Sequence, residues 1–173
     1  CDGGVKYAEP DEEHIYVNCG LQSHHFGSLG TRYLNLGAEA SGLQSSLPEI
    51  LAQIGAPQAL ARSSGGEGVV ILVVDSGVHG GRVPPDKRAG GWTDHPSGDP
   101  WTDDTGHGTM TALIALAVAP NAKLFSVRLK PGPNGGLMKE SVMSALDALI
   151  PLVQANPDMQ LVMNNSWGTS GCG

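Results

Sequence analysis

The sequence predicts an α/β fold with a mostly parallel central sheet. The first observation is a run of six apolar residues at 69–74, which has the length and β-branched composition of a strand buried on both faces. Asp75-Ser76-Gly77 then turns the chain at the carboxyl end of that strand, where open α/β sheets place ligands and catalytic groups. The second observation is the order of the later segments, because predicted strands at 123–129 and 160–163 are separated by predicted helices.

Two segments flank this first strand. Residues 48–61 are expected to form a short helix with one apolar face, ended by Ser-Ser-Gly-Gly. Residues 80–103 are rich in Gly, Pro and Asp and are predicted to be mainly loop. Three acidic residues lie near or just after the end of this stretch, Asp99, Asp103 and Asp104. We interpret them as a solvated loop rather than as a site for basic substrate residues.

Two longer helices are predicted downstream. The apolar run at 110–119 predicts a buried helix, with His107 in its first turn and Thr105 as its capping residue. Apolar residues recur through 138–153 at helical spacing, which predicts a second helix with one face in the core.

Asp75 and His107 are the candidate catalytic residues. An Asp at the carboxyl end of a buried strand is well placed to orient a base, and the small residues beside His107 let the backbone approach the imidazole closely. Each motif also has a plain structural interpretation, because Asp-Ser-Gly is often only a turn and His-Gly-Thr only the start of a helix. Their occurrence in one chain, in this order, favours a catalytic pair.

Four motifs follow one another along the chain. They are Asp-Ser-Gly at 75–77, Gly-His-Gly-Thr at 106–109, Val-Ala-Pro-Asn-Ala at 118–122 and Asn-Asn-Ser-Trp-Gly at 164–168. This set resembles the first half of a subtilisin-like serine peptidase of the subtilase family, over about residues 48–168. The resemblance implies the amino-terminal part of a three-layer subtilisin-like fold and a serine-type endopeptidase that hydrolyses peptide bonds.

The resemblance also implies roles for individual residues. Asp75 would orient the imidazole of His107, and His107 would act as the general base. An extended peptide would pair along the backbone at 135–137, and the pocket for the side chain before the scissile bond would be lined by 166–168. These predicted substrate-binding residues are Gly135, Gly136, Leu137, Ser166, Trp167 and Gly168.

No metal or other cofactor is expected. Many subtilases carry a longer insertion, often holding a calcium ion, between the helix and the Val-Ala-Pro segment, and this chain lacks it. The sequence also contains no Cys-x-x-Cys or His-x-x-x-His pair of the kind that binds zinc.

The nucleophile of the implied triad is not evident in this sequence. Gly168-Thr169-Ser170 copies part of the nucleophile motif but lacks the Met-Ala-x-Pro that should follow, so Ser170 is not expected to be the nucleophile. Three accounts remain open: a cleaved subtilase whose second polypeptide carries the nucleophilic Ser and the oxyanion Asn, a truncation, and a non-catalytic peptide-binding or regulatory relative. The two-chain account is preferred because a buried parallel strand needs neighbours on both edges.

Composition limits the partners. A chain of 173 residues with 40% hydrophobic content can bury a core of its own. Its net charge of −7, with only ten Lys and Arg, argues against nucleic acid or an anionic membrane as the main partner. No apolar stretch reaches the ~20 residues of a membrane span. The resemblance to subtilases implies a peptide or protein substrate as the partner.

The chain is divided into two parts, an amino-terminal extension at 1–47 and the amino-terminal part of a peptidase domain at 48–173. Residues 5–11 resemble the last strand of a subtilase propeptide; the alternative is an exposed acidic arm. A secreted or extracytoplasmic location is expected, in which two cysteines would pair and the third would stay free or bridge to another chain. The cysteines are Cys1, Cys19 and Cys172.

Overall fold

The computed structural model describes residues 14–15, 47–132 and 137–167. Its centre is a four-stranded sheet in the order β3-β4-β2-β6, with every neighbouring pair parallel. The strands, in sheet order, are β3 (Arg88–Thr93), β4 (Lys123–Arg128), β2 (Val69–Asp75) and β6 (Gln160–Asn164). The predicted α/β fold with a parallel central sheet is confirmed.

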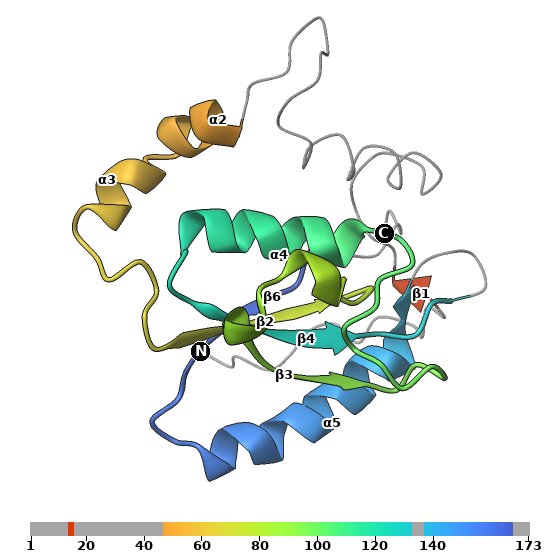
Figure 1. Ribbon diagram of the computed structural model, residues 1–173. Helices are drawn as coiled ribbons and strands as arrows, with labels where there is room; N and C mark the ends of the chain where they lie inside the picture. The colour runs from red at the N-terminus through yellow and green to blue at the C-terminus, as the bar shows by residue number, and fades with distance from the viewer. Residues whose placement is uncertain (1–13, 16–46, 133–136, 168–173) are drawn as a thin grey trace, which may run out of the picture.

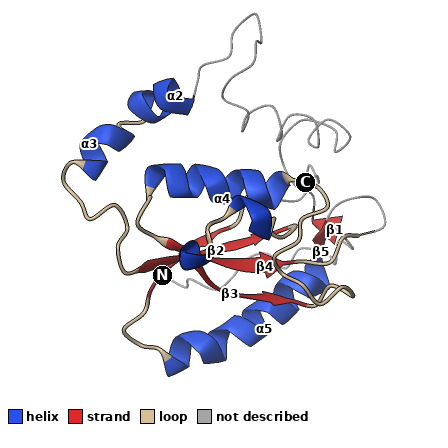
Figure 2. Ribbon diagram, in the orientation of Figure 1, coloured by secondary structure: helices blue, strands red, loops and turns tan. Residues whose placement is uncertain are grey.

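Two helices cover opposite faces of the sheet (Figures 1 and 2). Side chains of α4 (His107–Val118) and α5 (Lys139–Ala155) belong to two separate clusters of buried hydrophobic residues. β2 contributes to both, because successive side chains of a strand point to opposite faces. Leu72 and Val74 pack on the α5 side, whereas Ile71 and Val73 pack on the α4 side. This three-layer arrangement explains why 69–74 is a continuous apolar run rather than an alternating one.

One strand was not predicted. β3 lies within residues 80–103, a stretch predicted to be mainly loop. It contains two glycines, which disfavour strands, and a side chain at Gly91 would approach the Pro100 ring to 2.6 Å. Ser126 of β4 donates a hydrogen bond of 2.6 Å to the carbonyl of Pro100, so the loop after β3 packs back over the sheet. The same stretch also contains two short 3₁₀ helices, η2 (Gly80–Arg82) and η3 (Pro85–Lys87).

The single helix predicted at 48–61 is wrong in one respect. Two helices, α2 (Leu47–Gln53) and α3 (Ala56–Leu60), replace it. Gly55 separates them with a φ of 74°, a left-handed conformation that ends a helix. The expected apolar face is only partly packed, since Ile54 is 64% exposed whereas Leu51 and Leu60 are half-buried. Both helices lie outside the three layers (Figure 1).

A small ladder lies beside the main sheet. β5 (Leu137–Met138) pairs antiparallel with β1 (His14–Ile15), which belongs to the predicted amino-terminal extension. The other predictions for 1–47, including the propeptide-like segment at 5–11, lie outside the described residues, as do all three cysteines. Within the described part of the chain, no helix has the length and apolar character needed to cross a membrane.

Candidate active site

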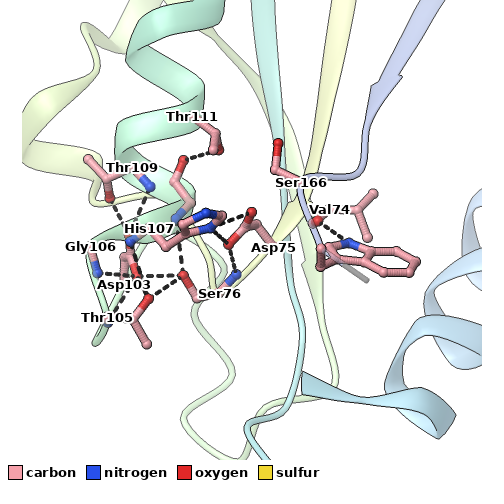
Figure 3. A network of polar contacts seen from close by, with 12 residues as sticks. Val74, Asp75, Ser76, Asp103, Thr105, Gly106, His107, Thr109, Thr111 and Ser166 are labelled. Carbon is pink, nitrogen blue, oxygen red and sulfur yellow. Dashed lines mark hydrogen bonds and ion pairs between the residues drawn. The ribbon is translucent and has the colours of Figure 1, made fainter. Parts of the chain in front are cut away.

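Asp75 and His107 meet at the carboxyl edge of the sheet (Figure 3). Asp75 is the last residue of β2 and is 0% exposed, and His107 is the first residue of α4 and is 3% exposed. Nδ1 of the imidazole lies 2.9 Å from Oδ1 and 3.0 Å from Oδ2 of the carboxylate. Because an ionised carboxylate only accepts hydrogen bonds, Nδ1 carries the hydrogen, and Nε2 is then the ring nitrogen that can accept a proton.

Two glycines permit this contact between β2 and α4. Gly77 has a φ of 102°, and a Cβ there would lie 2.1 Å from the carbonyl oxygen of Thr102. A Cβ at Gly108 would lie 2.1 Å from the carbonyl oxygen of Gly77 and 3.1 Å from the Cβ of Asp75. Gly77 and Gly108 are therefore required by close backbone packing, whereas a Cβ at Gly106 would have no neighbour within 4 Å.

Ser76 connects the turn after β2 to the start of α4. Its amide donates to Oδ1 of Asp75 at 2.7 Å, and its hydroxyl oxygen accepts from the amide of Gly108 at 3.1 Å and from the hydroxyl of Thr105 at 2.7 Å. Thr105 in turn accepts from the amide of His107 at 3.2 Å. The N-cap position itself is occupied by Gly106, with a φ of 81°, and not by Thr105 as predicted, although Thr105 satisfies an amide of the first turn.

The loop before α4 is held from β4 by Arg128. This side chain is 3% exposed and donates to Oγ of Ser97 at 2.5 Å and to the carbonyl oxygen of Asp99 at 3.0 Å. It also donates to the hydroxyl of Thr102 and pairs with Asp104 at 2.6 Å. Arg128 was not predicted, because its only signal in the sequence is a cation at the end of a strand that also contains Lys123 and Ser126.

Each of the three acidic residues of this loop accepts a hydrogen bond or forms an ion pair within the protein. Asp104 is 75% exposed and pairs with Arg128, and Asp99 accepts from the amide of Trp101 at 2.9 Å. Asp103 accepts hydrogen bonds from the first turn of α4, such as that from the amide of Thr109 at 2.8 Å. The interpretation of all three as a solvated loop is therefore wrong for Asp103, and the sequence analysis missed its contacts.

The predicted substrate-binding residues lie on two segments. Leu137 is buried in the core on the α5 side, and its backbone pairs with β1. Ser166 and Trp167 follow β6 after Asn165. The indole of Trp167 donates to the carbonyl oxygen of Val74, the residue before Asp75, at 2.8 Å. The remaining three, Gly135, Gly136 and Gly168, lie outside the described residues. Over the ranges that the structure describes, no three His, Cys, Asp or Glu side chains form a group that could hold a metal ion.

Comparisons with known proteins agree with this geometry. The profile of the subtilase family, Peptidase S8, matches residues 66–172. An alkaline protease of Alkalihalobacillus alcalophilus is 31% identical over 125 residues, which cover 66% of this chain and 32% of that protein. Subtilisin Savinase of Lederbergia lenta is 31% identical over 112 residues, which cover 59% of this chain and 40% of that protein. The chain thus spans about a third of the length of the first of these relatives. On the family match, and with the predicted resemblance confirmed, the chain belongs to the subtilase family.

Proposed function

We propose that this chain supplies the Asp and His of a Ser-His-Asp endopeptidase site. The observation that carries the proposal is the buried hydrogen bond between Asp75 and Nδ1 of His107, at 2.9 Å, in a chain of the subtilase family. A carboxylate that holds Nδ1–H leaves Nε2 to take the proton of a nucleophile, which is the division of labour in a Ser-His-Asp triad. The nucleophilic Ser and the oxyanion Asn come from a segment outside residues 1–173.

The reaction follows from these roles. Nε2 of His107 removes the hydroxyl proton of the serine while its oxygen attacks the scissile carbonyl, and Asp75 stabilises the imidazolium that forms. The imidazolium then returns the proton to the leaving amine as the peptide bond breaks. Water, deprotonated by the same imidazole, hydrolyses the acyl-enzyme and regenerates the serine.

The substrate is an extended peptide held along two segments. One is the predicted backbone edge at Gly135, Gly136 and Leu137. Its support is the antiparallel pairing of Leu137 with Ile15 of β1, whose place an extended peptide would take. The other is the predicted pocket segment of Ser166, Trp167 and Gly168. The hydrogen bond from Trp167 to Val74 supports this role, since it ties the segment to the strand that carries Asp75.

The serine-bearing segment docks against β6 in this proposal. β6 ends the sheet, and its outer edge has no strand partner within the described ranges. Val162 is 54% exposed and Met163 is 41% exposed. Successive residues of a strand point to opposite faces, so each face of β6 carries an exposed apolar side chain, although Leu161 packs against the core. A second polypeptide is the predicted source of this segment, and a continuation of the same polypeptide is the other source.

The domain boundary and the location belong to the same proposal. Residues 48–173 form the amino-terminal part of the peptidase domain, and residues 1–47 form an extension that precedes it. The family match, which begins at residue 66, supports the later part of this division. The secreted or extracytoplasmic location rests on the cysteine content alone.

Labelling with a fluorophosphonate serine probe tests the proposal. The purified protein is labelled, separated on a denaturing gel and analysed by mass spectrometry of the labelled peptide. Label on a serine outside residues 1–173 is expected, and its gel band distinguishes a second polypeptide from a continuation of this one. The label should be lost in the His107→Ala variant and kept in His95→Ala, since His95 lies in the loop and is not part of the proposed pair.

Two outcomes contradict the proposal. Label on Ser166 or Ser170 would place the nucleophile on this chain and remove the need for a docked segment. Absence of label from the complete protein, with His107 intact, would favour the non-catalytic peptide-binding or regulatory relative.

A further inference from the structure

Asp103 lies at the centre of the hydrogen bonds that join the turn after β2 to the start of α4 (Figure 3). Its Oδ1 accepts from the hydroxyl of Ser76 at 2.8 Å and from the amides of Thr105 and Gly106 at 3.1 and 2.9 Å. Its Oδ2 accepts from the amide of Thr109 at 2.8 Å and from the Thr109 hydroxyl at 2.5 Å. Each carboxylate oxygen therefore has donors of its own.

These donors lie next to the proposed catalytic pair on both sides. Ser76 follows Asp75, and its amide donates to that carboxylate, while Gly106 and Thr109 lie on either side of His107 at the start of α4. Asp103 thus fixes two separate pieces of backbone to one rigid group. The distance between the imidazole and Asp75 depends on how these two pieces are placed.

The start of a helix is a suitable place for such a carboxylate. The first amides of α4 have no partner within the helix, and the helix dipole is positive at this end, so both favour a negative group. Thr109 extends the connection further, because its hydroxyl oxygen also accepts from the amide of His79 at 2.9 Å. No uncharged side chain of the same size can accept at both of its terminal atoms.

We propose that Asp103 is a positioning residue that holds the imidazole of His107 in register with Asp75. This inference rests on the proposed function for its catalytic meaning, but the geometry it describes exists without the serine. Loss of the carboxylate lets the first turn of α4 shift against β2, and the hydrogen bond between Nδ1 and Asp75 becomes longer and more dynamic. Displacements of about 1 Å in such a site cost up to about 100-fold in rate.

Proton NMR of the complete protein tests this directly. The hydrogen on Nδ1 of His107 should give a resonance downfield of the amides, assigned by its loss in Asp75→Asn. In Asp103→Asn, which keeps the shape but accepts at only one atom, this resonance should broaden or move upfield. Asp104→Asn is the matched control, because Asp104 is the adjacent acid and pairs with Arg128 rather than with α4. An unchanged resonance in folded Asp103→Asn overturns the inference.

A second pair of variants applies if Asp103→Asn does not fold. Thr109→Val removes the hydroxyl that donates to Oδ2 of Asp103, and Thr109→Ser retains it. The Nδ1 resonance should weaken in Thr109→Val and be restored in Thr109→Ser. Equal spectra for the two variants would overturn the inference, because the contact to Asp103 would then have no effect on the imidazole.

Kinetics separate this inference from the proposed function. In the assembly that labels with fluorophosphonate, Asp103→Asn should lower kcat about 10- to 100-fold with KM within about twofold. If the protein has no serine-dependent activity at all, the proposed function fails while the NMR result still decides the role of Asp103. A normal kcat in Asp103→Asn would overturn the inference and leave the proposed function intact.

Discussion

The two ends of the central sheet differ in how well this chain covers them. At the β3 end, the loop that follows the strand folds back, Pro100 packs on Gly91, and Arg128 fixes the loop through several hydrogen bonds. At the β6 end, Val162 and Met163 are exposed and the outer edge of the strand has no partner in the described part of the chain.

This difference indicates where the fold is self-sufficient. The elements that bring Asp75 and His107 together, β2 and α4 with the loop held by Arg128, satisfy their polar groups within the chain: no buried side-chain N or O atom of the described residues lacks a hydrogen bond. The β6 end instead presents apolar side chains and an unpaired backbone edge, which is the form of a surface that pairs with further chain. The Asp75–His107 side of the proposed active site is therefore held by contacts within this chain, whereas its β6 side presents an edge that a further segment would cover.

The largest expected effect comes from Asp75→Asn, which removes the carboxylate that accepts the hydrogen bond from Nδ1 of His107. An Asn amide cannot hold Nδ1–H from both terminal atoms, so His107 no longer has its required tautomer, and kcat of the labelled assembly should fall about 10⁴-fold. Steady-state kinetics measure the loss. Asp86→Asn, at an exposed carboxylate in η3, should keep kcat within about twofold. Retention of more than a tenth of the activity in Asp75→Asn would disprove the assigned role.

Arg128→Met tests whether the covered end depends on one buried cation. The substitution removes the cation that donates to the Ser97 and Thr102 hydroxyls and one of the two donors to the Asp99 carbonyl, which should lower the free energy of unfolding by about 3 kcal/mol. Urea denaturation of the variant and of the parent protein gives the difference. Arg82→Met, at an exposed arginine of η2, should cost less than about 0.5 kcal/mol. Equal costs for the two variants would mean that the loop is held by other contacts.

Gly108→Ala tests the closeness of β2 and α4. The added methyl group would overlap the carbonyl oxygen of Gly77, so the two backbones must separate, at an expected cost of about 1 to 3 kcal/mol in unfolding free energy. Thermal or urea denaturation measures it. Gly81→Ala is the comparison, because its methyl group would meet only the ring of His79, a side chain that can move. A smaller cost at Gly108 than at Gly81 would contradict the assigned packing.

The smallest effect on the stability of the chain itself is expected at the β6 end of the sheet. Val162→Lys replaces an exposed side chain, so the unfolding free energy of the chain should change by less than about 1 kcal/mol. Binding of the serine-bearing segment should nevertheless weaken at least tenfold if that segment covers β6, measured by titration of the separated chains or by loss of probe labelling. Ile150→Lys, exposed on α5 instead, should leave binding unchanged. Equal weakening by both substitutions would argue against β6 as the docking edge.

Sequence reasoning located the elements whose residues repeat with a clear period. β2, β4, β6, α4 and α5 were all expected, because runs of apolar residues and helical stripes reflect burial directly. β3 was not, since its glycines are required by Pro100 and Phe125, which are distant in sequence. The break between α2 and α3 was also missed, because a single Gly in a helical pattern is commonly tolerated.

The candidate site was predicted only in part for the same reason. Asp75 and His107 stand in motifs whose neighbouring residues are small, which indicates close backbone packing around both. Asp75 also ends a predicted buried strand, where a catalytic group is expected. Arg128 acts through partners on another segment, so it has no local signature that separates it from a surface charge. Asp103 contacts the nearby start of α4, but its link to Ser76 joins residues 27 positions apart and is not visible in the local sequence. Local sequence reveals groups that need close backbone packing, whereas groups that connect loops become visible only when the chain is folded.

The hydrogen bond from the Trp167 indole to Val74 gives the protein an internal optical reporter. The last residue pair in register between β2 and β6 is Val73 with Asn164, so the indole occupies the next acceptor along β2 as the chain leaves the sheet. Tryptophan emission shifts with the polarity and hydrogen bonding of its ring. In a background where Trp92 and Trp101 are replaced by Phe, the emission wavelength would therefore follow the arrival of a peptide at the pocket segment and of a neighbour at β6, in real time and without an added dye.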